Sequence, residues 1–183
     1  MALVAIFGLE AAVGIVAGFL RTVLMQVPGL TGEASTRAVS GQSGLLFSLF
    51  GAVAIGVMLS PLAGRVDRQG PFRSCLAGLV SVAAALGLLW AGQGAWVWPA
   101  MVFYGVGYGL IFPAAAGAIA MAAAKEERGR GNGLFNFCFD LGLSTGPVVA
   151  GFFAYASSVN PFGTGMGFVG LATVGLVVVG RGR

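Results

Sequence analysis

The chain contains uncharged apolar runs that are too long for a soluble domain, and one of them extends from Ser74 to Ala124. A helix rises 1.5 Å per residue, so about 20 apolar residues cross the roughly 30 Å hydrocarbon core of a bilayer. Hydrophobic residues make up 57% of the chain and charged residues only 9%, whereas soluble domains carry about 25% charged residues. The sequence therefore predicts an all-α, polytopic membrane protein.

Six membrane-spanning helices result when the apolar runs are divided at their glycine and proline breaks. The run from Ser74 to Ala124 divides at Gly92-Gln93-Gly94, beside tryptophans typical of the membrane interface. The segment from Ser157 to Pro161 divides the last pair. The predicted helices cover residues 2–27, 42–63, 74–92, 96–124, 132–157 and 162–180.

The cations gather in alternate connections between these helices. The second and fourth connections and the carboxyl end hold eight of them, whereas the first, third and fifth connections hold only Arg37. Cytoplasmic loops carry the excess of Lys and Arg, so we expect both termini in the cytoplasm of a multi-pass protein of the plasma membrane (bacterial inner membrane). The eight cations are Arg65, Arg68, Arg73, Lys125, Arg128, Arg130, Arg181 and Arg183.

The net charge of +4 is explained by anionic lipid at the cytoplasmic surface, so membrane lipid is an expected partner and nucleic acid is not. The first connection, from Pro28 to Gly41, contains Glu33 and Arg37 one helical turn apart, which favours a short surface helix with a solvated ion pair.

The sequence offers few side chains suited to enzyme catalysis. The chain has no histidine, and both cysteines, Cys75 and Cys138, fall within apolar runs, where thiols act as small hydrophobic groups. We therefore expect no disulfide, no metal site, no cofactor and no enzymatic activity.

The connection SPLAGRVDRQGPFRS, residues 60–74, is a short cationic turn with one acid. It resembles the signature loop between the second and third helices in each half of the major facilitator superfamily. One residue is missing between Gly64 and Asp67, and Pro71-Phe72 stands where an arginine is usual. The resemblance implies a loop that stabilises one conformer, and a merely solvated loop is the alternative. The matching residues are Gly64, Asp67, Arg68, Gly70 and Arg73.

The fourth predicted helix contains FYGVGYGLIFPAAAG, which resembles the glycine- and proline-rich fourth helix of the same superfamily. Gly105, Gly109, Pro113 and Gly117 follow one another at four-residue spacing. Small residues at this spacing form a ridge against which another helix packs closely, and Pro113 predicts a kink.

The fifth predicted helix, GLFNFCFDLGLSTGPVVAG, resembles the antiporter signature of the exporters in this superfamily. Ala150 replaces one glycine of that pattern. The matching residues are Gly133, Gly142, Gly146, Pro147 and Gly151.

Charged residues within apolar helices are costly and often functional. Glu10 and Arg21 lie eleven residues apart, which returns to nearly the same helix face, so both could line a central cavity; Arg21 could equally extend to the headgroups. Asp140 follows Asn136 by one turn. It is a candidate proton carrier, and a structural hydrogen bond is the alternative.

The resemblance implies the carboxyl-terminal six helices of a twelve-helix transporter, of the sugar-efflux or drug-efflux type. We expect one domain, residues 1–183, built from two inverted three-helix repeats at about 1–92 and 93–183. It would act as half of an alternating-access transporter, with proton-coupled efflux of a small organic solute. A second six-helix half or a second copy would be its partner. The alternative is a truncated, non-transporting membrane protein or an interaction module.

Overall fold

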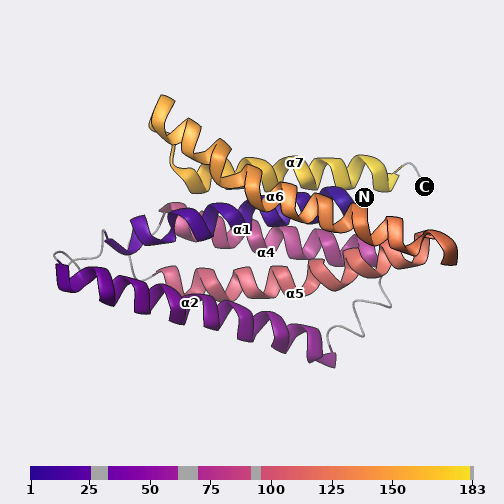
Figure 1. The fold of residues 1–183 in the computed structure, drawn as a ribbon, viewed down its shortest axis with the longest axis horizontal. Helices are drawn as coiled ribbons and strands as arrows, with labels where there is room; N and C mark the ends of the chain where they lie inside the picture. The colour runs from indigo at the N-terminus through magenta and orange to yellow at the C-terminus, as the bar shows by residue number, and fades with distance from the viewer. Residues whose placement is uncertain (26–32, 62–69, 92–95, 182–183) are drawn as a thin grey trace.

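The computed structural model describes residues 1–25, 33–61, 70–91 and 96–181. These residues form long α-helices and one short 3₁₀ turn (Figure 1), and no strand occurs among them. The elements are α1 (Ala2–Met25), α2 (Glu33–Leu59), α4 (Pro71–Ala91), α5 (Val97–Ala122), η2 (Lys125–Glu127), α6 (Arg128–Ser157) and α7 (Pro161–Arg181).

Six of the described helices are long and apolar enough to cross a membrane, so the predicted all-α polytopic fold is confirmed. Helices α2 and α6 begin nine and four residues earlier than predicted. Glu33 and Arg37 belong to the first turns of α2 itself, so the separate surface helix is wrong. The charged segment before residue 132 forms η2 and the first turn of α6. Backbone hydrogen bonding continues past the point where the apolar residues end.

The connection between α6 and α7 shows why the chain breaks there. Ser158 has φ of 53°, a left-handed conformation that ends α6. Asn160 Oδ1 then accepts a hydrogen bond of 2.9 Å from the Phe162 N–H, which satisfies one of the free donors at the start of α7. Pro161 is the first residue of α7, where its fixed φ suits the helix and its missing N–H costs nothing.

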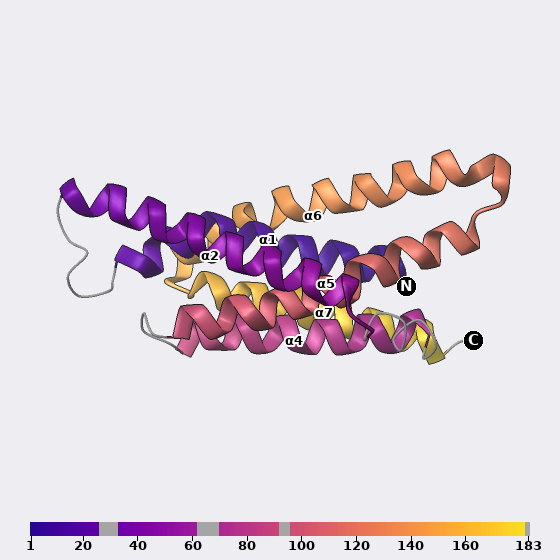
Figure 2. The same cartoon turned by 90° about the horizontal axis from the view of Figure 1, so that it is seen from below.

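Helix α1 is the centre of the packing. It contacts α6 and α7 most extensively, and α5 contacts α4 and α2. In the perpendicular view, α6 lies along one edge and α4 and α7 lie along the opposite edge, with α1 and α5 between them (Figure 2). Most residues of α1 are buried, whereas few of α2 and α6 are. The faces of α2 and α6 are therefore the least covered parts of the described chain.

Glycines bring α1 and α6 into backbone contact. A Cβ at Gly146 would collide with the Ala11 carbonyl, and a Cβ at Gly142 would lie 2.6 Å from the Phe7 oxygen. On α1, Gly14 lies against the Leu143 carbonyl. Pro147 supplies no N–H to that carbonyl, so the Leu143 carbonyl lacks its usual helical donor at the place where α1 comes close.

Helix α5 is held in the same way on two sides. Gly107 packs on the Gly78 carbonyl of α4, where an added Cβ would lie at 2.7 Å. Gly105 and Gly109 pack on α2 at Val53 and Val57. The hydroxyl of Ser81 also donates to the Phe103 carbonyl at 2.7 Å. Close backbone approach collects dispersion energy where no hydrophobic force acts between helices.

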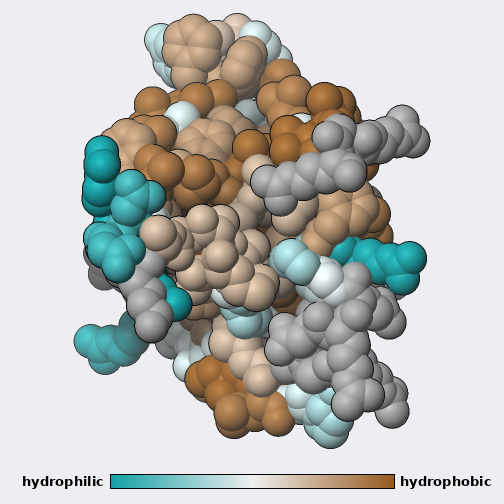
Figure 3. Space-filling model, turned by 90° about the vertical axis from the view of Figure 1, so that its right-hand side faces the viewer, coloured by the Kyte–Doolittle hydropathy of each residue, from teal (hydrophilic) through white to brown (hydrophobic). Residues whose placement is uncertain are grey.

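The start of α1 and the end of α7 lie at one end of the bundle, together with the start of α4 and the junction of α5 and α6 (Figure 1). The end of α5 and the beginning of α6 extend beyond the other helices there (Figures 1 and 2). Hydrophilic residues lie at the periphery of this end, with apolar residues between them (Figure 3). The described helix ends at this pole carry Arg73, Arg128, Arg130 and Arg181, whereas α1 ends and α2 begins at the other pole with Arg21 and Arg37.

The cation distribution predicts the sidedness of α6. Single cysteines at Gly129 and Ser158, both exposed, are placed in a background without Cys75 and Cys138. An impermeant maleimide added to intact cells should label the Ser158→Cys protein, while the Gly129→Cys protein should react only after permeabilisation. Labelling of both proteins from outside would contradict six spans with cytoplasmic termini.

The contact of α1 with α6 predicts different effects on stability for two glycine substitutions in α6. Gly146→Ala should lower the free energy of unfolding by about 1–3 kcal/mol, because the new methyl group meets helix backbone that cannot move aside. Gly133→Ala is the matched control, since nothing lies within 4 Å of a Cβ there. It should leave stability unchanged or raise it by up to about 1 kcal/mol. Denaturant titration in detergent micelles measures both, and equal effects would contradict the packing.

Candidate functional site

Glu10 is a buried carboxyl group in the middle of the bundle. It lies on α1 eight residues after Ala2, about 12 Å along the helix, and only 1% of its surface is exposed. Its Cβ would lie 3.0 Å from a Cβ built at Gly142, so the absence of a side chain at Gly142 leaves room for the acid between α1 and α6. Among the described residues, Glu10 Oε1 has no hydrogen-bond partner.

Two tyrosines of α5 reach α1 at this level. The Tyr108 hydroxyl is the side-chain hydrogen-bond partner of Glu10. One turn away, the fully buried Tyr104 donates from its hydroxyl to the Leu9 carbonyl at 3.4 Å. Both contacts therefore hold the same stretch of α1 against α5, one through backbone and one through the carboxyl group.

Asp140 of α6 lies near Glu10 and Tyr108, and its side chain is exposed in the described structure. It interacts electrostatically with Glu10, so the two groups repel each other when both are ionised. A pocket of about 340 Å³ opens here between α5 and α6, which we call the aromatic pocket. It is lined by Tyr108, Phe112, Phe135, Asn136, Phe139 and Asp140.

The rings of the aromatic pocket pack on one another. Tyr108 and Phe112 are stacked with centroids 5.5 Å apart and planes 10° from parallel. Phe135 and Phe139 meet Phe112 edge-on, at 5.6 and 6.3 Å. Phe50 of α2 supports Tyr108 from behind at 5.4 Å. These edge-to-face and stacked pairs are favourable aromatic geometries, so the wall of the pocket has a defined shape.

The structure thus brings together three of the four predicted proton or substrate residues. Glu10, Asp140 and Asn136 meet around Tyr108. Arg21 does not join them: it is exposed and lies about 16 Å further along α1. The site therefore contains two acids, and none of the six residues that line the pocket is basic.

The predicted switch loop lies partly outside the described residues, since Gly64, Asp67 and Arg68 fall in the range 62–69. Gly70 has φ of 85°, a left-handed conformation that glycine adopts without strain. Arg73 is exposed in the first turn of α4.

The predicted hinge and packing residues have different surroundings. Gly105 and Gly109 pack on α2, and Gly142 and Gly146 pack on α1, as described above. Pro147 lies against Gly14 and Gly18 of α1, and a Cβ added at Gly151 would lie 3.8 Å from the Phe19 ring. In contrast, a Cβ added at Gly133 would meet no atom of another described helix within 4 Å. Pro113 and Gly117 are exposed and line a pocket of about 370 Å³ beside the start of α4.

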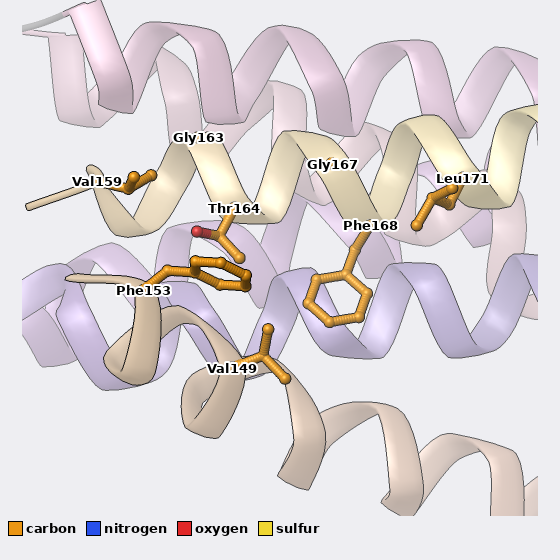
Figure 4. Close-up of a pocket in the computed structure, with 8 residues that line it drawn as sticks. All are labelled: Val149, Phe153, Val159, Gly163, Thr164, Gly167, Phe168 and Leu171. Carbon is orange, nitrogen blue, oxygen red and sulfur yellow. The ribbon is translucent and has the colours of Figure 1, made fainter. Parts of the chain in front are cut away.

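A further cavity, which we call the apolar groove, lies between the end of α6 and the beginning of α7 (Figure 4). The side chains of Val149, Phe153, Thr164 and Phe168 point toward one another there (Figure 4), around a space of about 390 Å³. Its lining contains one hydroxyl and no charged group. The groove can hold an apolar group, but it offers no means to bind a proton or a charged solute.

Within the described ranges, no three His, Cys, Asp or Glu side chains gather as a metal site requires. Cys75 is buried, Cys138 is partly buried, and both are free thiols.

Sequence reasoning missed the aromatic residues of the pocket. Tyr108 and Phe112 lie four residues apart on α5, and Phe135 and Phe139 lie four residues apart on α6. This spacing places each pair on one helix face. Asn136 and Asp140 each follow one residue of the Phe135–Phe139 pair. This aromatic pair beside a polar pair could have indicated the pocket from the sequence.

The chain matches a family model described as Major Facilitator Superfamily over residues 2–182. No curated protein matches the chain.

The contact between Glu10 and Tyr108 predicts coupling between two substitutions. Tyr108→Phe alone should lower the free energy of unfolding by about 1–3 kcal/mol, because a buried carboxyl group loses its partner. In a Glu10→Gln background the same change should cost less, with a coupling energy of about 0.5–3 kcal/mol from the double-mutant cycle. Tyr155→Phe, at a residue that is 93% exposed, is the matched control. Purely additive effects would show that the two side chains do not interact.

Proposed function

Because the chain belongs to the major facilitator superfamily, we propose that it forms one half of a secondary active transporter that exports a small organic solute in exchange for protons. Transport is the function of this family. The half-domain, its carboxyl-terminal position in a twelve-helix transporter, the direction and the proton coupling are our proposals. The arrangement of Glu10, Tyr108 and Asp140 beside the aromatic pocket supports the coupling most directly.

The internal packing supports an assembly of two three-helix repeats. In two such repeats, α1 corresponds to α5, α2 to α6 and α4 to α7. The extensive contact of α1 with α6 in one repeat order then corresponds to the contact of α5 with α2 in the other. In the same way, the contact of α1 with α7 becomes that of α5 with α4. Both members of each pair are present in the described chain, as an inverted repeat requires.

The exposure of the pocket supports a missing second wall. Asn136 and Asp140 are exposed in the six-helix chain, and a charged group that faces lipid costs about 2.5–3.5 kcal/mol even on the insertion scale. A second six-helix half or a second copy of this chain would cover them. Alternating access is then a rocking of one half against the other around a site between them.

The carboxyl groups supply the proposed coupling. Glu10 is buried, no cation contacts it within the described ranges, and Asp140 is an exposed residue of the pocket lining. Intramembrane acids of this kind form proton relays in pumps and transporters. A proton and a solute that use neighbouring groups influence each other's binding reciprocally, so each can drive the movement of the other.

A proteoliposome assay tests this proposal. The purified full chain is reconstituted with pyranine trapped inside, a pH gradient is imposed, and proton movement is recorded when glucose, leucine or 10-methylacridinium is added. We expect at least one of these solutes to accelerate proton movement. Asp140→Asn should abolish that acceleration while solute exchange without net proton movement survives, because an amide cannot carry the proton. Glu126→Gln, at an exposed residue before α6, should behave as wild type.

Cross-linking of the same samples tests the half-transporter. Flux should be confined to vesicles that contain cross-linkable dimers or hetero-complexes. Solute flux by verified monomers would contradict the need for a second half. Absence of any solute-dependent proton movement would favour the alternative of a non-transporting membrane protein.

A further inference from the structure

We propose that the aromatic pocket binds a planar aromatic cation, which would be the substrate of the transporter proposed above. Only the role of this ligand as a transported substrate rests on the proposed function. Binding at the pocket can be tested separately from transport. Three independent features of the pocket carry the inference: its ring walls, its acids and its size.

The walls are aromatic from both helices. Phe112 of α5 and Phe135 and Phe139 of α6 enclose one cavity with Tyr108. Aromatic faces attract cations through the ring quadrupole, and they also stack on other flat rings. The mutual edge-on contacts of these residues, at 5.6 and 6.3 Å, hold the rings in place before any ligand enters. A flat ligand therefore meets a surface that is already organised.

The polar groups of the pocket select the sign of the ligand charge. Asp140 lines the cavity, and Glu10 lies behind Tyr108, 99% buried with one oxygen lacking a partner in the described chain. None of the six lining residues is basic. A cation in the pocket would relieve the repulsion between the two acids, whereas an anion would add to it.

The lining also disfavours a sugar. A polyhydroxyl solute needs many donors and acceptors, because each polar group left unpaired on burial costs about 1–3 kcal/mol. The pocket offers three polar side chains, Tyr108, Asn136 and Asp140, against three phenylalanines. Its volume of about 340 Å³ lies within the range of roughly 300–1,000 Å³ typical of small-molecule sites.

Three probes that share one ring system test the proposal: 10-methylacridinium, acridine and acridine-9-carboxylate. They carry positive, neutral and negative charge at mildly alkaline pH. Binding to the full chain in nanodiscs is followed by probe fluorescence and anisotropy, with empty nanodiscs as the blank. We expect saturable binding of the cation, weaker binding of acridine, and none of the anion.

Two substitutions separate charge from stacking. Asp140→Asn should weaken binding of 10-methylacridinium by at least about tenfold through loss of the nearby charge, and it should leave acridine binding unchanged. Phe112→Leu should weaken the cation by about 2- to 30-fold and should weaken acridine as well. Glu126→Gln and Phe152→Leu, both at exposed positions of the described chain, are the matched controls and should change neither.

Equal affinity for the three probes, or an Asp140→Asn protein that binds the cation as wild type does, would overturn the proposal. Loss of cation binding when the chain is cross-linked to its second half would also overturn it, because side chains of that half would then occupy the pocket. Saturable cation binding without any solute-linked proton movement would keep the site and reject the proposed transport. Proton movement driven only by glucose or leucine would reject the cation and keep the transport.

Discussion

The contact between α1 and α6 determines where every candidate functional group lies. Gly142 and Gly146 let the backbones of these helices touch, and Gly14 receives the carbonyl that Pro147 leaves without a partner. Larger side chains would separate the helices by the thickness of a methyl group or more, and Glu10 would then move away from Asp140. In a bilayer, where lipid tails are as apolar as leucine, such close approach is what gives one helix a preference for another. The glycine spacing in α6 that resembles the antiporter signature therefore serves first to let α6 pack closely on α1.

Helix α5 completes the arrangement from the other side. Glycines at Gly105 and Gly107 fix it between α2 and α4, and Tyr104 anchors it to the backbone of α1. Tyr108 is then presented to Glu10 one turn later. A carboxyl group that is buried with a single tyrosine as hydrogen-bond partner is expensive to maintain, and the described structure offers it no cation. The cost is consistent with a functional group rather than a packing element.

The sequence predicted the number of helices, because hydropathy reports directly on what the bilayer requires. It misplaced the starts of α2 and α6, since hydropathy ends where side chains become polar while the helix continues through Glu33 and Arg128. Glu10 and Asp140 were predicted because a charge stands out in an apolar helix. The aromatic residues of the pocket were missed for the opposite reason: in a chain that is 57% hydrophobic, a phenylalanine provides no contrast. Which apolar face meets which is decided by packing between helices, and no single helix contains that information.

The length of α6 has a consequence for the proton coupling proposed above. Its 30 residues extend about 45 Å, which exceeds the roughly 30 Å of hydrocarbon by some ten residues. Counted from its end at Ser157, the helix has used about 25 Å when it reaches Asp140. In a bilayer whose hydrocarbon begins at Ser157 and whose normal follows α6, this acid would lie within about one helical turn of the opposite boundary, on the side of the two termini. The junction of α5 and α6, which extends beyond the other helices, would then project from that boundary into water. The two routes to Asp140 would thus be unequal: access from the pole of the termini would cross about one helical turn, while access from the opposite pole would cross most of the bilayer. A centre with this asymmetry needs a gate mainly on its short side and a conduit on its long side.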